Sequence, residues 1–136
     1  MEPTKFDFPI KSHSELGEIH GWIDTQKGTE VAGARFWYLK GDLALLNIAG
    51  GEIAVLFLSA KGFGVMISPY RVQEAALFGT GFLPAGADGV YAVNPGEDNL
   101  YLIGTSEIPL TSYHMNEIID VSKPNLYVGY SPCFRR

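Results

Sequence analysis

The most strongly apolar stretch of the sequence runs from Leu43 to Ala60, and its hydrophobic residues fall on nearly every side of a helix. A helix with that pattern is usually buried on more than one side. The stretch therefore predicts one long helix over 42–61, ended by Gly62. Polar residues and glycines interrupt the apolar run, which argues against a membrane span. The interrupting residues are Asn47, Gly50, Gly51, Glu52 and Ser59.

Two adjacent glycines, Gly50 and Gly51, lie in the middle of this predicted helix. An interior glycine costs a helix about 1 kcal/mol relative to alanine. Two of them in succession predict either a kink in the helix or a neighbouring backbone that approaches very closely.

The remaining pattern mixes short helices and strands. Ser12 and Glu15 have the spacing of a capping box, which predicts a helix from His13 to about Asp24. No βαβ repeat appears, so the order favours an α+β fold with a mainly antiparallel sheet. The other predictions are an extended lead-in (1–10), a polar turn region (26–33), strands (34–39, 64–67), a helix (72–78), a glycine-rich loop (79–89), two strands (91–93, 100–103) paired across the turn 94–99, a helix (108–119) and a last strand (126–130, or as far as 134).

Size and charge narrow the class of protein. The 136 residues fit one domain, and the net charge of −5 comes without any basic run that would indicate a nucleic-acid surface. Cys133 is the only cysteine, which excludes a disulfide framework and a cysteine-rich zinc site within one chain. We expect it on a buried strand. The first residues lack the pattern of a signal peptide, so a soluble, cytoplasmic protein is expected.

Two other kinds of site are not favoured. His13, His20 and His114 lie in separate regions without ligand spacing, so no protein-built metal site is expected. The loop over 79–89 is rich in glycine, but no Lys-Ser or Lys-Thr pair follows it as in a phosphate-binding loop. We interpret it as a loop at the edge of a pocket.

Thr105, Ser106 and Glu107 allow two interpretations. On or just after a strand, side chains two residues apart face the same way, so Thr105 and Glu107 could converge on a small amino-acid ligand. Alternatively, Thr105 or Ser106 begins a helix, and Glu107 is stabilised there by the helix dipole. The residues alone leave both open.

Collinear segments carry a family resemblance. The most informative are Leu100 to Leu110 and Tyr130 to Arg136, supported by Phe6 to Gly17, by Gly33 to Asp42 with its following helix and strand, and by Phe78 to Pro84. Together they resemble the catalytic core of the class II aminoacyl-tRNA synthetases, specifically seryl-tRNA synthetase. Within that resemblance, 33–69 is similar to motif 1 and 130–136 to the start of motif 2.

The resemblance implies a reaction and a site. Serine is activated with ATP, carried with Mg²⁺, to seryl-adenylate and transferred to tRNA(Ser). Thr105, Ser106 and Glu107 are expected to bind serine, with Ser106 where alanine is commoner. Arg135 is expected to be catalytic and, with Arg136, to bind ATP. Helix 42–61 is expected to form a homodimer interface, and Gly50 and Gly51 are unusual within it.

Several family segments are not found in the sequence. The motif 2 glutamate, motif 3 and the tRNA-binding arm are absent, so residues 1–136 are expected to be the N-terminal part of the catalytic domain, with little activity alone. Two alternatives stay open: a related ligase that loads amino acids onto a carrier protein, and a non-catalytic paralogue that only dimerises.

Overall fold

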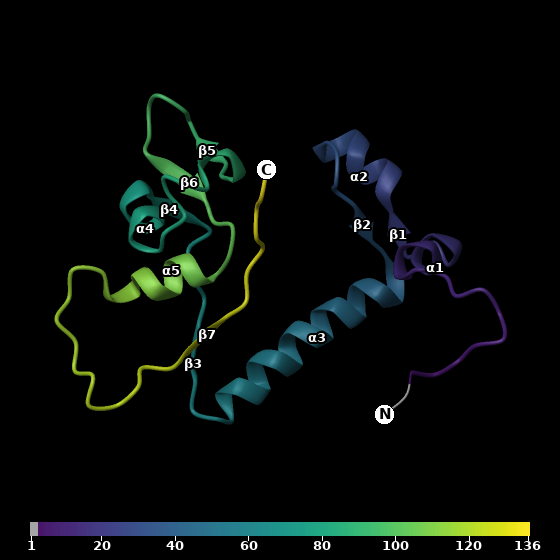
Figure 1. Cartoon of the computed structure of the whole chain (residues 1–136), viewed down its shortest axis with the longest axis horizontal. Helices are drawn as coiled ribbons and strands as arrows, with labels where there is room; N and C mark the ends of the chain where they lie inside the picture. Colours follow the sequence, from purple (N-terminus) through teal and green to yellow (C-terminus); the bar gives the residue numbers. More distant parts are fainter. Residues whose placement is uncertain (1–2) are drawn as a thin grey trace. The chain divides into compact units, whose positions relative to one another are not determined.

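The computed structural model describes residues 3–136, in two compact units, Met1–Glu52 and Ile53–Arg136 (Figure 1). Residues 3–10 contain no helix or strand, as predicted for the lead-in, whose residues 1 and 2 lie outside the described part. Along the chain follow α1 (His13–Ile19), β1 (Ile23–Asp24), α2 (Thr25–Ala32), β2 (Tyr38–Leu39), α3 (Gly41–Ser59), β3 (Gly64–Met66), β4 (Arg71–Gln73), α4 (Glu74–Gly79), the 3₁₀ helix η1 (Ala87–Gly89), β5 (Ala92–Val93), β6 (Leu100–Leu102), α5 (Glu107–Thr111), the 3₁₀ helix η2 (Ser112–His114) and β7 (Tyr127–Gly129).

The capping box of α1 is confirmed. The Glu15 N–H donates to Ser12 Oγ at 3.2 Å, and the Glu15 carboxylate accepts the Ser12 N–H at 2.7 Å. The helix ends at Ile19, earlier than predicted, because the chain turns at Gly21 with a φ of +67°. Glycine adopts that conformation without steric cost.

The predicted polar turn over 26–33 is wrong, because this segment forms helix α2. Asp24 caps it: its carboxylate accepts the Lys27 N–H at 3.0 Å. That hydrogen bond, followed by the one from Lys40 Nζ at 3.1 Å, holds the pKa of Asp24 below its usual value. A short polar helix with little apolar surface gives almost no periodic signal, so only the cap could have indicated it.

Gly28 is the buried residue of α2, and it fixes how this helix lies on the following strand. A Cβ at Gly28 would collide with the backbone of Phe36 and Trp37. The helix therefore lies against the chain that leads into β2, which pairs antiparallel with β1. Only glycine allows that approach without displacing backbone.

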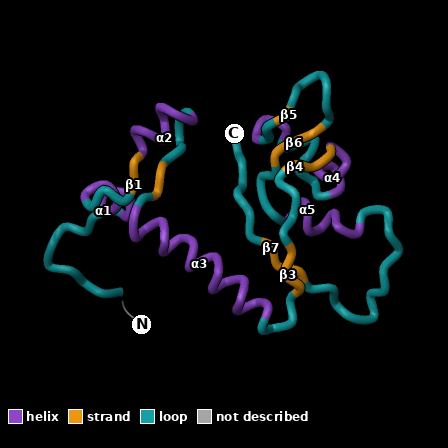
Figure 2. Tube along the Cα trace, turned by 180° about the vertical axis from the view of Figure 1, so that it is seen from behind, coloured by secondary structure: helices purple, strands orange, loops and turns teal. Residues whose placement is uncertain are grey.

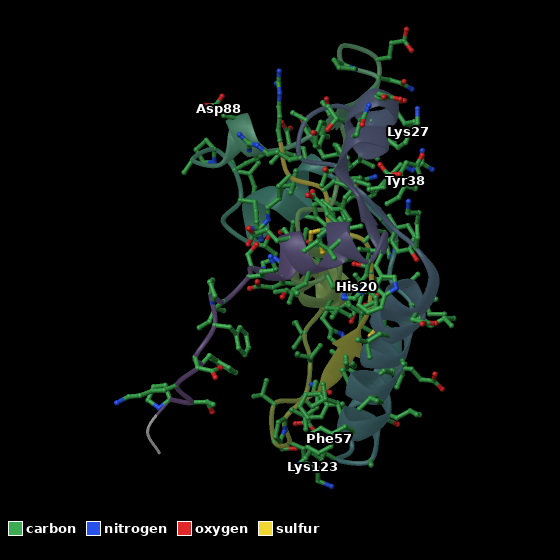
Figure 3. The ribbon with its side chains drawn as sticks, turned by 90° about the vertical axis from the view of Figure 1, so that its right-hand side faces the viewer. His20, Lys27, Tyr38, Phe57, Asp88 and Lys123 are labelled. Atoms are coloured by element: carbon green, nitrogen blue, oxygen red, sulfur yellow. The ribbon has the colours of Figure 1, made fainter. Side chains whose placement is uncertain are left out.

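Helix α3 confirms the long helix predicted from the apolar run, and Figures 2 and 3 show it as one continuous helix whose side chains include Phe57. None of its residues is buried against the described chain. A Cβ at Gly50 would meet nothing within 4 Å, so the close neighbour expected there is not in residues 3–136. By length and composition alone the helix could also cross a membrane, a test that core helices of soluble proteins pass as well.

The second unit holds the buried core and most of the sheet. Strands β4, β6 and β5 form an antiparallel sheet, with Val72 opposite Tyr101 and Ala92 opposite the other side of Tyr101. The predicted pairing of 91–93 with 100–103 is thereby confirmed. Strand β3 pairs with β7 in parallel. The α+β, mainly antiparallel class is confirmed. The buried members of the hydrophobic core are Val72, Ala76, Leu77, Ile103 and Ile108.

Several other boundaries also differ from the predictions, and the strand expected over 34–39 is confined to β2. The helix expected from Val72 begins only at Glu74, after strand β4. The helix expected to reach Ile119 is shorter, and Asn116 takes a left-handed φ of +64° just beyond η2. The last strand ends at Gly129, which pairs with Met66, the last residue of its partner strand β3. Cys133, expected on a buried strand, is therefore outside it and exposed.

We predict that Gly28→Ala destabilises the first unit by about 1–3 kcal/mol, because the added methyl group forces backbone apart and outweighs the better helix propensity of alanine. Urea unfolding followed by circular dichroism measures the change. Thr29→Ala is the matched control, since Thr29 is exposed on the same helix. Equal stability of the Gly28 and Thr29 variants would contradict the close packing.

Candidate active site

The turn between β6 and α5 contains the predicted serine-binding residues. Strand β6 ends at Leu102 and α5 begins at Glu107, so Thr105 and Glu107 do not share a strand. The expectation that strand geometry points them the same way is therefore wrong. Thr105 Oγ1 instead accepts the N–H of Glu107 at 3.3 Å, which places Thr105 in the helix-start role.

Glu107 lines an open cavity of about 600 Å³ beside α5 and β7. The side chain is exposed, and within residues 3–136 it forms no hydrogen bond or ion pair. A carboxylate placed in this way is available to an ammonium group. The cavity is also lined by Leu110, Thr111, His114, Ile119, Asn125, Tyr127, Val128 and Gly129.

A histidine joins the two walls of this cavity. His114 Nδ1 lies 2.8 Å from a Glu117 carboxylate oxygen, and its Nε2 lies 2.6 Å from the Tyr127 hydroxyl. The contact holds η2 against β7. Sequence reasoning considered His114 only as a metal ligand and missed this role. Tyr127 lies 13 residues from His114, so no local pattern indicates this contact.

Arg135 is tied to the same turn from the other side. Its Nε donates to the carbonyl oxygen of Gly104 at 3.1 Å, and the N–H of Phe134 donates to that of Ile103 at 2.8 Å. The Arg136 N–H donates to Gly89 at 3.1 Å. Both arginines are therefore held by hydrogen bonds within the second unit, Arg135 through its side chain and Arg136 through its backbone N–H.

Both arginines line a second cavity, of about 250 Å³. Gly86 and Gly89 border it, so the glycine-rich loop does lie at the edge of a pocket. Glu107 and Arg135 thus line different cavities, although Gly104 connects their segments by a hydrogen bond. The remaining lining residues are Leu77, Phe82, Val90, Gly104 and Ile108.

Ser106 has a different partner from its neighbours. Its hydroxyl lies 2.5 Å from that of Ser131, and it makes no capping hydrogen bond to α5. In the described part of the chain, no three His, Cys, Asp or Glu side chains are grouped to hold a metal ion.

No family model matches the chain. It is 47% identical over 135 residues to the serine–tRNA ligase of Corynebacterium diphtheriae, covering 98% of this chain and 32% of that protein. It is 48% identical over 136 residues to that of Mycobacterium sp. strain KMS, covering 99% and 32%. The chain is a serine–tRNA ligase homologue. It spans about a third of the length of the serine–tRNA ligases that it matches.

Solved structures agree with this assignment. The seryl-tRNA synthetase of Pyrococcus horikoshii complexed with ATP superposes with a TM-score of 0.90 at 39% identity, covering 96% of this chain and 29% of that one. The cytoplasmic serine–tRNA ligase of Naegleria fowleri in complex with AMP gives 0.82 at 31% identity, covering 90% and 29%. The seryl-tRNA synthetase resemblance of the sequence is confirmed.

We predict that Tyr127→Phe costs about 1 kcal/mol of stability, because His114 loses its hydrogen bond between η2 and β7. Tyr113→Phe is the matched control: Tyr113 packs edge-on against both His114 and Tyr127, and among residues 3–136 no hydrogen bond involves its hydroxyl. Thermal unfolding of both variants measures the difference. Equal losses in the two variants would contradict a specific contribution from this hydrogen bond.

Proposed function

We propose that this chain is part of the catalytic core of a serine–tRNA ligase, which activates serine with ATP and transfers it to tRNA(Ser). The observation that carries the proposal is the match of nearly the whole chain to serine–tRNA ligases in both sequence and fold. The alternatives of a carrier-protein ligase and a non-catalytic paralogue have no comparable support.

Glu107 and Thr105 are the proposed serine contacts, within the segment Thr105 to Glu107. The unpaired carboxylate of Glu107 at the large cavity suits the ammonium group of the amino acid. Thr105 can serve the helix start and the substrate together, because a hydroxyl accepts one hydrogen bond and still donates another.

Arg135 and Arg136 are the proposed ATP-binding residues, and Arg135 the catalytic one. Attack of a carboxylate on the α-phosphate brings two anions together, so a guanidinium that holds both lowers the barrier. Arg135 uses its Nε on Gly104, which leaves its terminal nitrogens for a phosphate. We expect Mg²⁺ to arrive with ATP, and the reaction to take place in the cytoplasm.

The decisive experiment uses a chimera in which residues 1–136 replace the matching third of the C. diphtheriae serine–tRNA ligase. We expect serine-dependent exchange of pyrophosphate into ATP, serine transfer to tRNA(Ser), and little exchange by the 136-residue chain alone. A folded chimera without exchange would overturn the proposed function. Transfer only to a carrier protein would favour that alternative.

In the chimera we predict that Glu107→Ala lowers kcat/KM for serine by about 100-fold or more, since the substrate ammonium loses its charge partner. Glu97→Ala, an exposed glutamate in the turn between β5 and β6, should leave serine kinetics unchanged. If Glu107 only begins α5, its loss costs about 1 kcal/mol of stability and serine kinetics stay near wild type.

We also propose that α3 forms a homodimer interface. Leu45, Ile53 and Phe57 are each at least 60% exposed on a helix whose apolar residues would otherwise face water. Apolar surface of this extent usually marks an interface. The open space at Gly50 would let the helix of a second copy approach closely.

We predict that the chain sediments as a dimer or larger assembly at micromolar concentration, and that Gly50→Leu weakens association at least tenfold by blocking close approach. The control is Gly79→Leu, which places the same side chain in open space at the end of α4. A monodisperse monomer refutes the interface, and unchanged association of a soluble Gly50→Leu chain refutes the role of the glycine.

A further inference from the structure

Two serine hydroxyls from distant parts of the second unit form a hydrogen bond. Ser106 Oγ lies 2.5 Å from Ser131 Oγ, and the contact is partly buried. Ser106 immediately precedes α5, where a serine side chain commonly caps the helix, yet it forms no such bond. Its hydroxyl contacts a segment 25 residues away in the sequence instead.

This contact is one of three hydrogen bonds between two segments of the chain, Ile103 to Ser106 and Ser131 to Arg135. Besides the hydroxyl pair, the Ile103 carbonyl accepts the Phe134 N–H at 2.8 Å, and the Gly104 carbonyl accepts Arg135 Nε at 3.1 Å. Both neighbours of Thr105 are therefore anchored to the segment Ser131 to Arg135. Thr105 itself accepts the N–H of Glu107.

We propose that Ser106 and Ser131 are a positioning pair, which fixes the turn Gly104 to Glu107 against the segment that carries Arg135. The hydroxyl of Ser106 then acts on Ser131 and not on the substrate. The identity of the ligand that the turn binds rests on the proposed function. The inference that the pair fixes the turn does not depend on that function. One hydroxyl donates and the other accepts, so alanine at either position removes the link.

Such a link affects binding because Thr105 and Glu107 have no other side-chain anchor in the described part of the chain. A ligand group bound by a short turn loses affinity when the turn can move by a fraction of an ångström. Loss of the pair should therefore weaken serine binding even when the altered residue is Ser131, which lies outside the proposed serine-binding segment.

The first experiment tests the link without any activity. In the 136-residue chain, Ser106→Ala and Ser131→Ala should each raise the unfolding equilibrium constant about fivefold, the usual net effect of one hydrogen bond. The double variant should be no less stable than either single one, because both remove the same link. The matched control is Ser112→Ala, a half-buried serine at the other end of α5 without a side-chain bond in residues 3–136.

The second experiment measures serine kinetics in the chimera. Ser106→Ala and Ser131→Ala should each raise the KM for serine about fivefold, with no further rise in the double variant. Ser131→Thr keeps a hydroxyl and should restore the wild-type KM, and Ser112→Ala should not change it. A purely structural role would lower stability and leave this KM unmoved.

Three results would overturn the proposal. Additive losses of stability show that the hydroxyls act independently. A higher KM for Ser106→Ala with a normal KM for Ser131→Ala shows that Ser106 contacts serine directly. Normal KM values for both folded variants remove the positioning role. If the wild-type chimera folds but lacks exchange, the proposed function fails, and the stability coupling alone decides whether the pair fixes the turn.

Discussion

The second unit depends on the backbone of one residue, Ile103. Its side chain is fully buried in the core. Its N–H donates to the carbonyl of Tyr70 at 3.0 Å, and its carbonyl accepts the N–H of Phe134 at 2.8 Å. Because Ile103 is buried, its backbone N–H and its carbonyl both need a hydrogen-bond partner. A buried polar group without a partner costs about 1–3 kcal/mol. The position of the turn that follows is set by this requirement.

The sequence was most informative where a pattern had one physical cause. The apolar run predicted α3, the spacing of Ser12 and Glu15 predicted the cap of α1, and the turn residues over 94–99 predicted the pairing of the strands on either side. It was least informative for α2, whose helix depends on a single carboxylate cap and on a glycine packed against the backbone of Phe36 and Trp37, neither of which gives a periodic pattern.

For the candidate site, residue types could be predicted and their geometry could not. Glu107 was assigned from its place in a family-like segment, but its free carboxylate and the cavity beside it arise from the packing of α5 on β7. The Ser131 partner of Ser106 and the Tyr127 partner of His114 lie far away in sequence. Contacts of that kind depend on tertiary structure, for which one sequence holds no periodic signal.

The parallel pairing of β3 with β7 has a consequence for how the second unit is made. Gly64 pairs with Tyr127, so a strand near the beginning of the unit can pair only after a strand near its end has been synthesised. During synthesis from the N-terminus, β4, α4 and the β5–β6 hairpin can assemble from local contacts while the β3 edge is still open. We therefore expect closure of that edge, and with it the placing of Arg135 beside Gly104, to come late in folding.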